Sequence, residues 1–329
     1  MVTESFRKID AHSHFGKSYF GPDSIPQDYL NNARSLNIIA SVISPAPTPE
    51  IKNNELIFRP CIWKPRESPN QVQYVSQEEN TLTGETIENS VQRNPYFETN
   101  EKLINFVRET NYISSSPRLM VMPTYHPLLD DLKKFTLLLD QPEVVAIKIH
   151  GIATFTGPES ISRQAVKEIQ RRQLPVVVHT DMYKGEITNQ LDFAREMNHP
   201  RKWARWSIEN SIPILLTHGA RLDIETMKII RNKKNIFVGC SPDLYLFEER
   251  THSLAVPTNN FLSDLFNLTC PEQLVFDIDF GWNLKNTKTG FEKDWDMDKR
   301  IELNAKNKKI IRRDLENIYF NNASNFYKI

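Results

Sequence analysis

The sequence predicts an α/β protein: a (β/α)8 barrel, or TIM barrel, with an insertion after its second strand. Short apolar runs rich in β-branched residues recur along the 329 residues at helix-sized intervals. Some of them, such as Val144–Ile147 and Pro175–Val178, are apolar on both faces, which is typical of buried parallel strands. Amphipathic segments lie between these runs. About eight strand–helix units fit a (β/α)8 barrel, which takes roughly 250 residues before insertions.

The predicted strands and helices alternate as far as residue 279, and this alternation favours a parallel sheet. The predicted strands are Arg7–His12, Ile38–Ser44, Leu119–Tyr125, Val144–His150, Leu174–His179, Ile212–His218, Ile236–Cys240 and Leu274–Asp279. The predicted helices include Asp131–Leu139, Ser160–Gln173, Ile187–Asn198, Leu222–Asn232 and Asn259–Leu268. A charged amphipathic helix over Asp296–Asn322 is expected to close the barrel.

Residues 45–96 do not follow the repeat. This stretch is rich in Pro, Asn, Gln and Glu and comes directly after the second predicted strand. Two interpretations stay open: an insertion on a βα loop that covers the site, and an excursion on the surface. We expect a single domain over residues 1–329.

Composition and charge argue against several classes of function. Lys+Arg and Asp+Glu both number 41, so bulk electrostatics supplies no attraction to nucleic acid or to a membrane surface. No apolar run reaches the roughly 20 residues of a membrane span. The segment Met1–Lys8 lacks the apolar core of a signal peptide. The three cysteines, Cys61, Cys240 and Cys270, show no pairing pattern and favour a reducing compartment. We therefore expect a cytoplasmic protein, and a homo-oligomer stays open.

His12 and His14 lie at the end of the first predicted strand, where the chemistry of such barrels is found. Side chains two apart on a strand point to the same face, so the two imidazoles can bind one metal ion together. A pair like this on its own is more often a surface or core feature. The other strand ends carry further polar residues: Lys148, His150, His179, His218, Asp277 and Asp279. Five of the eight histidines thus gather at predicted strand ends, and this combination predicts a metal site.

The order of these residues resembles the amidohydrolase superfamily. His-x-His, Lys, His, His and Asp follow one another on strands one, four, five, six and eight. The motifs Ile-Asp-Ala-His-Ser-His, Ile-Lys-Ile-His, Val-Val-His-Thr, Leu-Thr-His-Gly and Leu-Val-Phe-Asp-Ile-Asp-Phe resemble its amidohydrolase-related branch. That branch includes aminocarboxymuconate-semialdehyde decarboxylase, aromatic-acid decarboxylases, lactonases and other hydrolases.

The resemblance implies a ligand set. His12, His14, His179 and Asp279 match the ligands of the single-metal sites in this branch. His218 matches a histidine that either ligates a second metal or contacts the substrate. Asp277 stands where the family usually has Gly, and by position Asp279 is the better match to the family Asp.

The chemistry of these residues also fits a metal. Zn²⁺ takes imidazole nitrogen and carboxylate oxygen and keeps a position for water, whose pKa it lowers to about 7. Asp279 can accept the proton of that water, and His218 can polarise a substrate carbonyl. Mn²⁺ or Fe²⁺ would tolerate the same ligands. One ion is the preferred count.

Lys148 has three open interpretations, because a buried ammonium must be paired, neutral or modified. It could carry a carbamate that bridges two metals, with His179 and His218 on the second ion. It could bind a substrate carboxylate, or pair with Asp277. His150 is expected at the mouth of the barrel, where it contacts substrate. Arg221 is expected at the surface in a first helical turn, the alternative being contact with an anionic substrate.

The sequence therefore predicts a metal-dependent hydrolase that attacks the carbonyl carbon of a small-molecule amide, lactone or ester. Non-oxidative decarboxylation of an unsaturated or aromatic acid is the alternative reaction. It needs a basic group for the substrate carboxylate, and no Arg is predicted inside the barrel, which favours hydrolysis slightly. A non-catalytic metal-binding barrel is a third interpretation. The phosphotriester and nucleoside-deaminase branches of this fold also stay open.

Overall fold

Eight strands, paired in parallel, form the wall of the barrel, and all eight predicted strands are confirmed. The computed structural model describes residues 6–16, 26–46, 58–68, 71–80, 86–90, 93–113, 117–183, 185–187, 190–241, 261–280, 297–308 and 310–329. The strands are β1 (Lys8–Phe15), β2 (Ile38–Pro45), β6 (Arg118–Val121), β7 (Ile147–Ile149), β8 (Val176–Val178), β9 (Ile214–Leu216), β10 (Ile236–Gly239) and β11 (Leu274–Val275).

Backbone hydrogen bonds join the strands into one ring. Two parallel sheets run in the orders β1-β2-β6 and β11-β10-β9-β8-β7. At one seam, Val121 pairs with Val144 and Thr124 with Lys148, in parallel. At the other seam, residues 276–280 run beside β1: Ala11 N donates to Phe276 O at 3.0 Å, and Asp279 N donates to His12 O at 2.9 Å. The strands therefore surround one interior, in sequence order.

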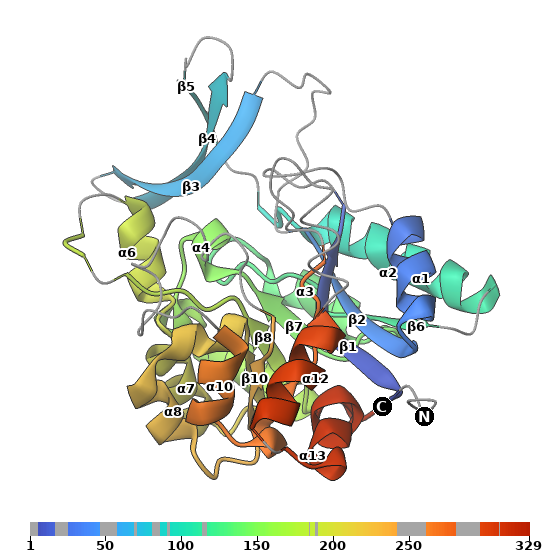
Figure 1. The fold of residues 1–329 in the computed structure, drawn as a ribbon. Helices are drawn as coiled ribbons and strands as arrows, with labels where there is room; N and C mark the ends of the chain where they lie inside the picture. The colour runs from blue at the N-terminus through green and yellow to red at the C-terminus, as the bar shows by residue number, and fades with distance from the viewer. Residues whose placement is uncertain are drawn as a thin grey trace.

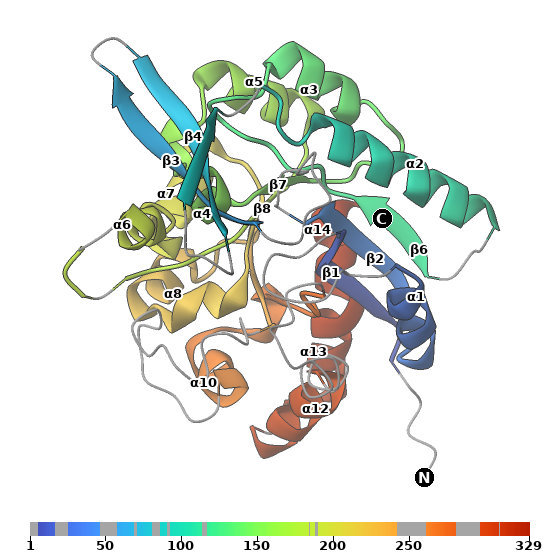
Figure 2. The same cartoon turned by 90° about the horizontal axis from the view of Figure 1, so that it is seen from above.

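Helices surround the strands (Figure 2). They are α1 (Pro26–Ser35), α2 (Phe97–Ile113), α3 (Leu132–Leu139), α4 (Gly151–Thr154), α5 (Arg163–Arg172), α6 (Gln190–Met197), α7 (Pro200–Asn210), α8 (Ile224–Ile230), α10 (Phe261–Leu268), α12 (Met297–Asn307), α13 (Arg312–Glu316) and α14 (Asn322–Tyr327). Within the described segments, none of them has the length and apolar character needed to cross a bilayer.

Side-chain caps explain where several helices begin. Asp131 accepts a hydrogen bond from Lys134 N before α3, Ser162 accepts one from Ala165 N before α5, and Asp223 accepts one from Thr226 N before α8. Each cap satisfies an amide that the first helical turn leaves without a partner. These helix starts lie within three residues of the predicted ones.

Apolar side chains fill the lower interior of the barrel and α14 closes that end. The interior cluster includes Ile9, Ala11, Ala40, Val42, Met120, Val177, Leu215 and Val275. Phe326 of α14 packs into the same cluster. The Tyr327 hydroxyl donates to Ala11 O at 2.5 Å. The C-terminal helix thus seals the end at which the strands begin, and polar side chains occupy the end at which they finish.

The prediction of one continuous helix over Asp296–Asn322 is wrong. The chain leaves α12 after Asn307 and bends before α13, which is followed by a π-helical turn over Asn317–Asn321 and then by α14. Ile311 is extended, with φ −80° and ψ 162°. β-Branched residues such as Ile310 and Ile311 favour extended backbone, and the bend lets α14 turn under the barrel.

The segment between β2 and α2 contains a three-stranded antiparallel sheet. Its strands are β3 (Phe58–Ser68), β4 (Gln71–Asn80) and β5 (Thr86–Ser90), in the order β3-β4-β5. β3 lies against α4, and the sheet stands above the barrel in Figure 1. These strands lie within residues 45–96, for which the sequence predicts an insertion on a βα loop or a surface excursion.

The variant Tyr327→Phe tests whether the hydrogen bond from Tyr327 of α14 to Ala11 stabilises the closed end of the barrel. The variant leaves the buried Ala11 carbonyl without the hydroxyl donor, so we expect the free energy of unfolding to fall by about 1–2 kcal/mol. Urea denaturation measures the change. Tyr112→Phe is the matched control, because Tyr112 is 93% exposed. Equal stability of the two variants would contradict the role given to Tyr327.

Candidate metal centre

β1 carries His12 and His14 into the interior of the barrel. The register of β1 against β2 shifts between Asp10 and Ser13. Ile9 and Ala11 belong to the interior cluster, and His12, which lies within the shifted stretch, and His14 beyond it also face the interior, because a bulge changes which side chains point inward. Their ring centroids lie 4.7 Å apart, edge to face. The two imidazoles therefore share one face, as predicted.

Asp10 holds this irregular stretch of β1 in place. Its carboxylate accepts hydrogen bonds from His12 N at 3.3 Å and from Ile278 N at 2.9 Å. The hydroxyls of Ser13 and Tyr29 donate to its other oxygen at 2.6 Å and 2.5 Å. Burial raises the pKa of Asp10 to about 6, and these hydrogen bonds oppose the rise. The sequence analysis did not single out Asp10, although it precedes His12 by only two residues.

Asp279 completes a group of three donors with His12 and His14. Its Oδ1 lies 3.4 Å from His12 Nδ1 and 3.5 Å from His14 Nε2. The donor atoms of the three residues all lie within 4.8 Å of one another. Asp279 has a positive φ of 56°, a conformation that Asp tolerates better than most residues.

This group fits a divalent metal ion. His12 Nδ1 is buried and has no hydrogen-bond partner among the described residues, although buried polar atoms are normally paired. Two imidazole nitrogens and one carboxylate oxygen are ligands that Zn²⁺, Mn²⁺ and Fe²⁺ accept. Burial, and after it the charge of Lys148, lowers the pKa of both histidines well below the usual value. Both rings are therefore neutral and keep a lone pair for a metal.

The end of β2 orients His14. Its Nδ1 lies 2.7 Å from Ser44 Oγ and 3.3 Å from Pro45 O. A carbonyl can only accept, so this pair favours a proton on Nδ1 and leaves the lone pair on Nε2, which faces Asp279. Such outer contacts fix the ring and tautomer of a metal-binding histidine. Ser44 was not among the predicted residues.

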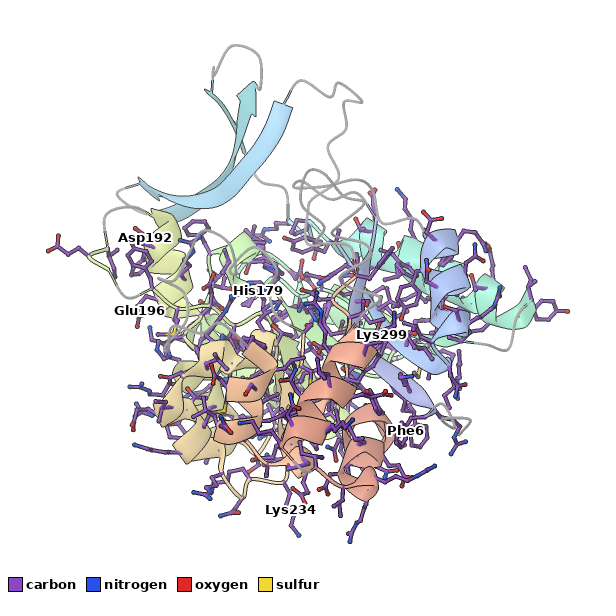
Figure 3. All side chains as sticks on the ribbon, in the orientation of Figure 1. Phe6, His179, Asp192, Glu196, Lys234 and Lys299 are labelled. Atoms are coloured by element: carbon purple, nitrogen blue, oxygen red, sulfur yellow. The ribbon has the colours of Figure 1, made fainter. Side chains whose placement is uncertain are left out.

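His218 lies beside the group formed by His12, His14 and Asp279. His179 contacts His218 and lies further from this group. His218 Nδ1 is 3.7 Å from Asp279 Oδ2, and His218 Nε2 is 2.9 Å from His179 Nδ1. The structure thus brings His12, His14 and Asp279 together and does not place His179 among their donors. Figure 3 labels His179 near the centre of the view. Burial lowers the pKa of both His179 and His218 well below the usual value, so these rings are neutral as well.

Lys148 contacts the site through His12. Its Nζ lies 2.6 Å from His12 Nε2 and is fully buried. Burial lowers the pKa of Lys148 to about 7, and the charges of Asp279 and Asp277 oppose the drop. Among the described residues, the direct contact is with His12 and not with Asp277, so the proposed ion pair with Asp277 is absent from this structure.

Asp277 holds the end of β10. Ser241 N donates to its Oδ1 at 2.6 Å, and the Ser241 hydroxyl donates to Oδ2 at 2.8 Å. A Cβ at Gly239 would lie 2.4 Å from Asp277 Oδ2, so a larger residue there would displace the Asp277 carboxylate. Burial raises the pKa of Asp277 to about 7. Its Oδ2 is 3.9 Å from His12 Nδ1, further than the contact of Asp279.

His150 caps a helix. Its Nδ1 accepts a hydrogen bond from Ala153 N at the start of α4. Its ring stacks on His179, with centroids 4.2 Å apart and planes 22° apart. The second contact places His150 beside His179.

The prediction that Arg221 lies at the surface is wrong. The expected surface residue is fully buried, and its Nη2 lies 3.4 Å from His179 Nε2. The segment His218–Leu222 forms a left-handed turn, with positive φ at all five residues, rather than the start of α8. Gly219 is the one residue in it that signals such a backbone. Arg221 is therefore an arginine inside the barrel. Hydrolysis was slightly favoured over decarboxylation because no such arginine was predicted, and this reason no longer holds.

Sequence comparison identifies no relative. No known family matches the chain, and no curated protein is similar to it in sequence.

Solved structures do share its fold. The 5-carboxyvanillate decarboxylase LigW from Sphingomonas paucimobilis superposes with a TM-score of 0.54 at 9% identity, over 99% of this chain and 100% of its own. IDCase from Metarhizium anisopliae has a TM-score of 0.54 at 12% identity, over 100% and 98%. An enamidase of the amidohydrolase superfamily has a TM-score of 0.47 at 9% identity, over 99% and 68%. The chain therefore shares the fold of the first two enzymes.

Proposed function

We propose that this protein is a metal-dependent enzyme of the amidohydrolase superfamily that hydrolyses an amide, lactone or ester of a small molecule. The observation that carries the proposal is the convergence of His12, His14 and Asp279. Their donor atoms lie within 4.8 Å of one another, buried where the barrel strands end.

Each residue has a distinct part in this proposal. His12, His14 and Asp279 would hold the ion, with Zn²⁺ as the first choice and Mn²⁺ or Fe²⁺ as alternatives. When bound, the ion supplies Lewis acidity to water and to the substrate carbonyl. Asp279 accepts the proton of the attacking water at its carboxylate. His218, with Nδ1 3.7 Å from Asp279 Oδ2, lies where it can polarise the carbonyl.

We retain two further assignments. His179 remains a candidate fourth ligand of the ion. Its Nδ1 contacts His218 Nε2 in this structure and would have to lose this contact to bind the ion. If Lys148 is carboxylated, it could hold a second ion together with His179 and His218, and His150 would face the substrate. We prefer one ion. We also propose a cytoplasmic location, supported by the free thiols of Cys240 and Cys270.

Non-oxidative decarboxylation of an unsaturated or aromatic acid is the second candidate reaction. The buried guanidinium of Arg221 beside His179 favours it, because this reaction needs a cation for the substrate carboxylate. The fold shared with a 5-carboxyvanillate decarboxylase is consistent with it.

We expect His12→Ala and Asp279→Asn each to lower metal affinity by more than about 100-fold. Loss of a contact outside the ligand shell already lowers metal affinity by about 10–100-fold, and loss of a ligand should lower it further. Metal content by mass spectrometry after dialysis gives the measurement. His199→Asn is the matched control, because His199 only caps α7 and Asn keeps a capping oxygen. Full metal content in either ligand variant would refute the site.

Ser44→Ala tests the orientation of His14. The variant removes the contact at Nδ1 and keeps the ring, so we expect metal affinity to fall by about 10-fold with little change in stability. Competition with a chelator measures the affinity. Ser35→Ala on the exposed end of α1 is the control. An affinity equal to that of the wild type would show that Pro45 O alone orients the ring.

The two reactions leave different products from the metal-loaded enzyme. Hydrolysis in ¹⁸O-labelled water places one labelled oxygen in the acid product, whereas decarboxylation of aromatic acids releases CO₂ without labelling the organic product. We expect labelled acid from a panel of lactones, esters and amides. Release of CO₂ without labelled acid would favour decarboxylation over hydrolysis. The absence of both products would favour the non-catalytic barrel.

A further inference from the structure

Three successive amides around Asp279 bond to β1. Ile278 N donates to Asp10 Oδ1 at 2.9 Å. Asp279 N donates to His12 O at 2.9 Å, and Phe280 N donates to Ser13 Oγ at 3.1 Å. In a regular parallel ladder the acceptors are backbone carbonyls, whereas two of the three acceptors here are side-chain oxygens. Asp10 and Ser13 therefore replace backbone acceptors on either side of Asp279.

Asp279 itself has a left-handed backbone, with a φ of 56°. This conformation costs energy for a residue with a Cβ, although Asp tolerates it better than most, and it persists where the surroundings hold it. The bonds at Ile278 N and Phe280 N restrain the chain directly before and after Asp279. Backbone angles set the direction in which a side chain leaves the chain. These bonds therefore help to aim the Asp279 carboxylate, whose Oδ1 faces His12 and His14.

Asp10 and Ser13 are also joined to each other. The Ser13 hydroxyl donates to Asp10 Oδ2 at 2.6 Å, which leaves its lone pairs for Phe280 N. The hydroxyl of Tyr29, on α1, donates to the same Asp10 oxygen at 2.5 Å, and it lies 2.7 Å from Ser41 Oγ on β2. The side chains of Asp10, Ser13, Tyr29 and Ser41 are fully buried. The pair of Asp10 and Ser13 is thus anchored to two neighbouring elements besides β1.

Neither residue of this pair is a candidate metal ligand. Within the described part of the chain, the donors that could share one ion belong to His12, His14 and Asp279. The Asp10 carboxylate instead accepts hydrogen bonds from two amides and two hydroxyls, which is about as many as a carboxylate can accept. Asp10 and Ser13 therefore act on a metal through the residues that they hold and not by coordination.

We propose that Asp10 and Ser13 are positioning residues that hold the Asp279 carboxylate in its ligand position before a metal binds. This inference rests on the proposed function, because it takes His12, His14 and Asp279 as the metal ligands. A carboxylate that is held in advance does not have to be ordered when the ion arrives, so the metal binds more tightly. Contacts outside the ligand shell change metal affinity by roughly 10–100-fold.

Ser13→Ala tests the proposal, because alanine offers no acceptor to Phe280 N. We expect zinc affinity to fall about 10-fold in competition with a chelator. We also expect the visible absorption spectrum of the cobalt-loaded protein to change, since the cobalt(II) bands report the arrangement of the ligands. Ser207→Ala is the matched control, because Ser207 is equally buried and donates to Ile212 O at 2.6 Å, away from the site. This control loses stability and keeps the wild-type metal affinity and spectrum.

A double-mutant cycle tests whether the effect of Ser13 passes through Asp279. Asp279→Gly removes the carboxylate, and glycine accepts the positive φ of this position. In the Asp279→Gly background we expect Ser13→Ala to change metal affinity less than twofold, because there is no carboxylate left to position. An equal loss of affinity in both backgrounds would overturn the route through Asp279.

A second variant covers the case in which Ser13→Ala does not fold. Asp10→Asn keeps one oxygen for Ile278 N and places an NH₂ group where the Ser13 and Tyr29 hydroxyls donate. We expect metal affinity to fall at least threefold, with a change in the cobalt spectrum. Asp131→Asn is the control, because Asp131 caps α3 at the surface and Asn keeps the capping oxygen.

The outcomes separate this inference from the proposed function. Wild-type affinity and spectrum in Ser13→Ala or in Asp10→Asn, with affinity still lost in His12→Ala, would overturn the role of the pair and leave the metal centre in place. A wild-type protein that binds neither zinc nor cobalt would overturn both. These measurements use no substrate, so their result does not depend on whether the reaction is hydrolysis or decarboxylation.

Discussion

The backbone seam between β1 and residues 276–280 is the constraint on which the site depends. Asp279 N donates to His12 O, and His14 N donates to Phe280 O at 2.7 Å. These bonds close the ring and bring residues from opposite ends of the chain side by side. Asp10 bonds to the amides of both segments, so the same carboxylate holds the irregularity in β1 and its neighbour across the seam. Because the donors lie directly across this seam, the distances among His12, His14 and Asp279 follow from ring closure.

Burial and charge then define what the site can do. Apolar side chains and α14 fill the lower barrel, and above them burial lowers the pKa of His12, so this imidazole is neutral. Two of the buried basic side chains, Lys148 and Arg221, contact different histidines. Lys148 contacts His12, whereas Arg221 lies behind His179.

Much of the fold and part of the site could be predicted from the sequence. Apolar periodicity locates all eight strands, because a buried parallel strand needs an uninterrupted apolar run. The strand ends then indicate His12, His14 and Asp279. Periodicity cannot show the shift in β1 that turns His12 inward, the left-handed turn that buries Arg221, or the bend before α13. Each depends on tertiary contacts, such as Asp10 with Ile278 N or Gly219 against Phe261, that local sequence does not encode. The polar strands β3–β5 lack the apolar pattern used to find the others.

We propose that His12, His14 and Asp279 bind one divalent ion, and anomalous diffraction at the zinc edge from crystals of the zinc-loaded protein can locate that ion. We expect one peak at bonding distance from these three residues, roughly 2.0–2.2 Å from each donor atom. A peak elsewhere in the molecule, or none at this position in fully loaded protein, would contradict it.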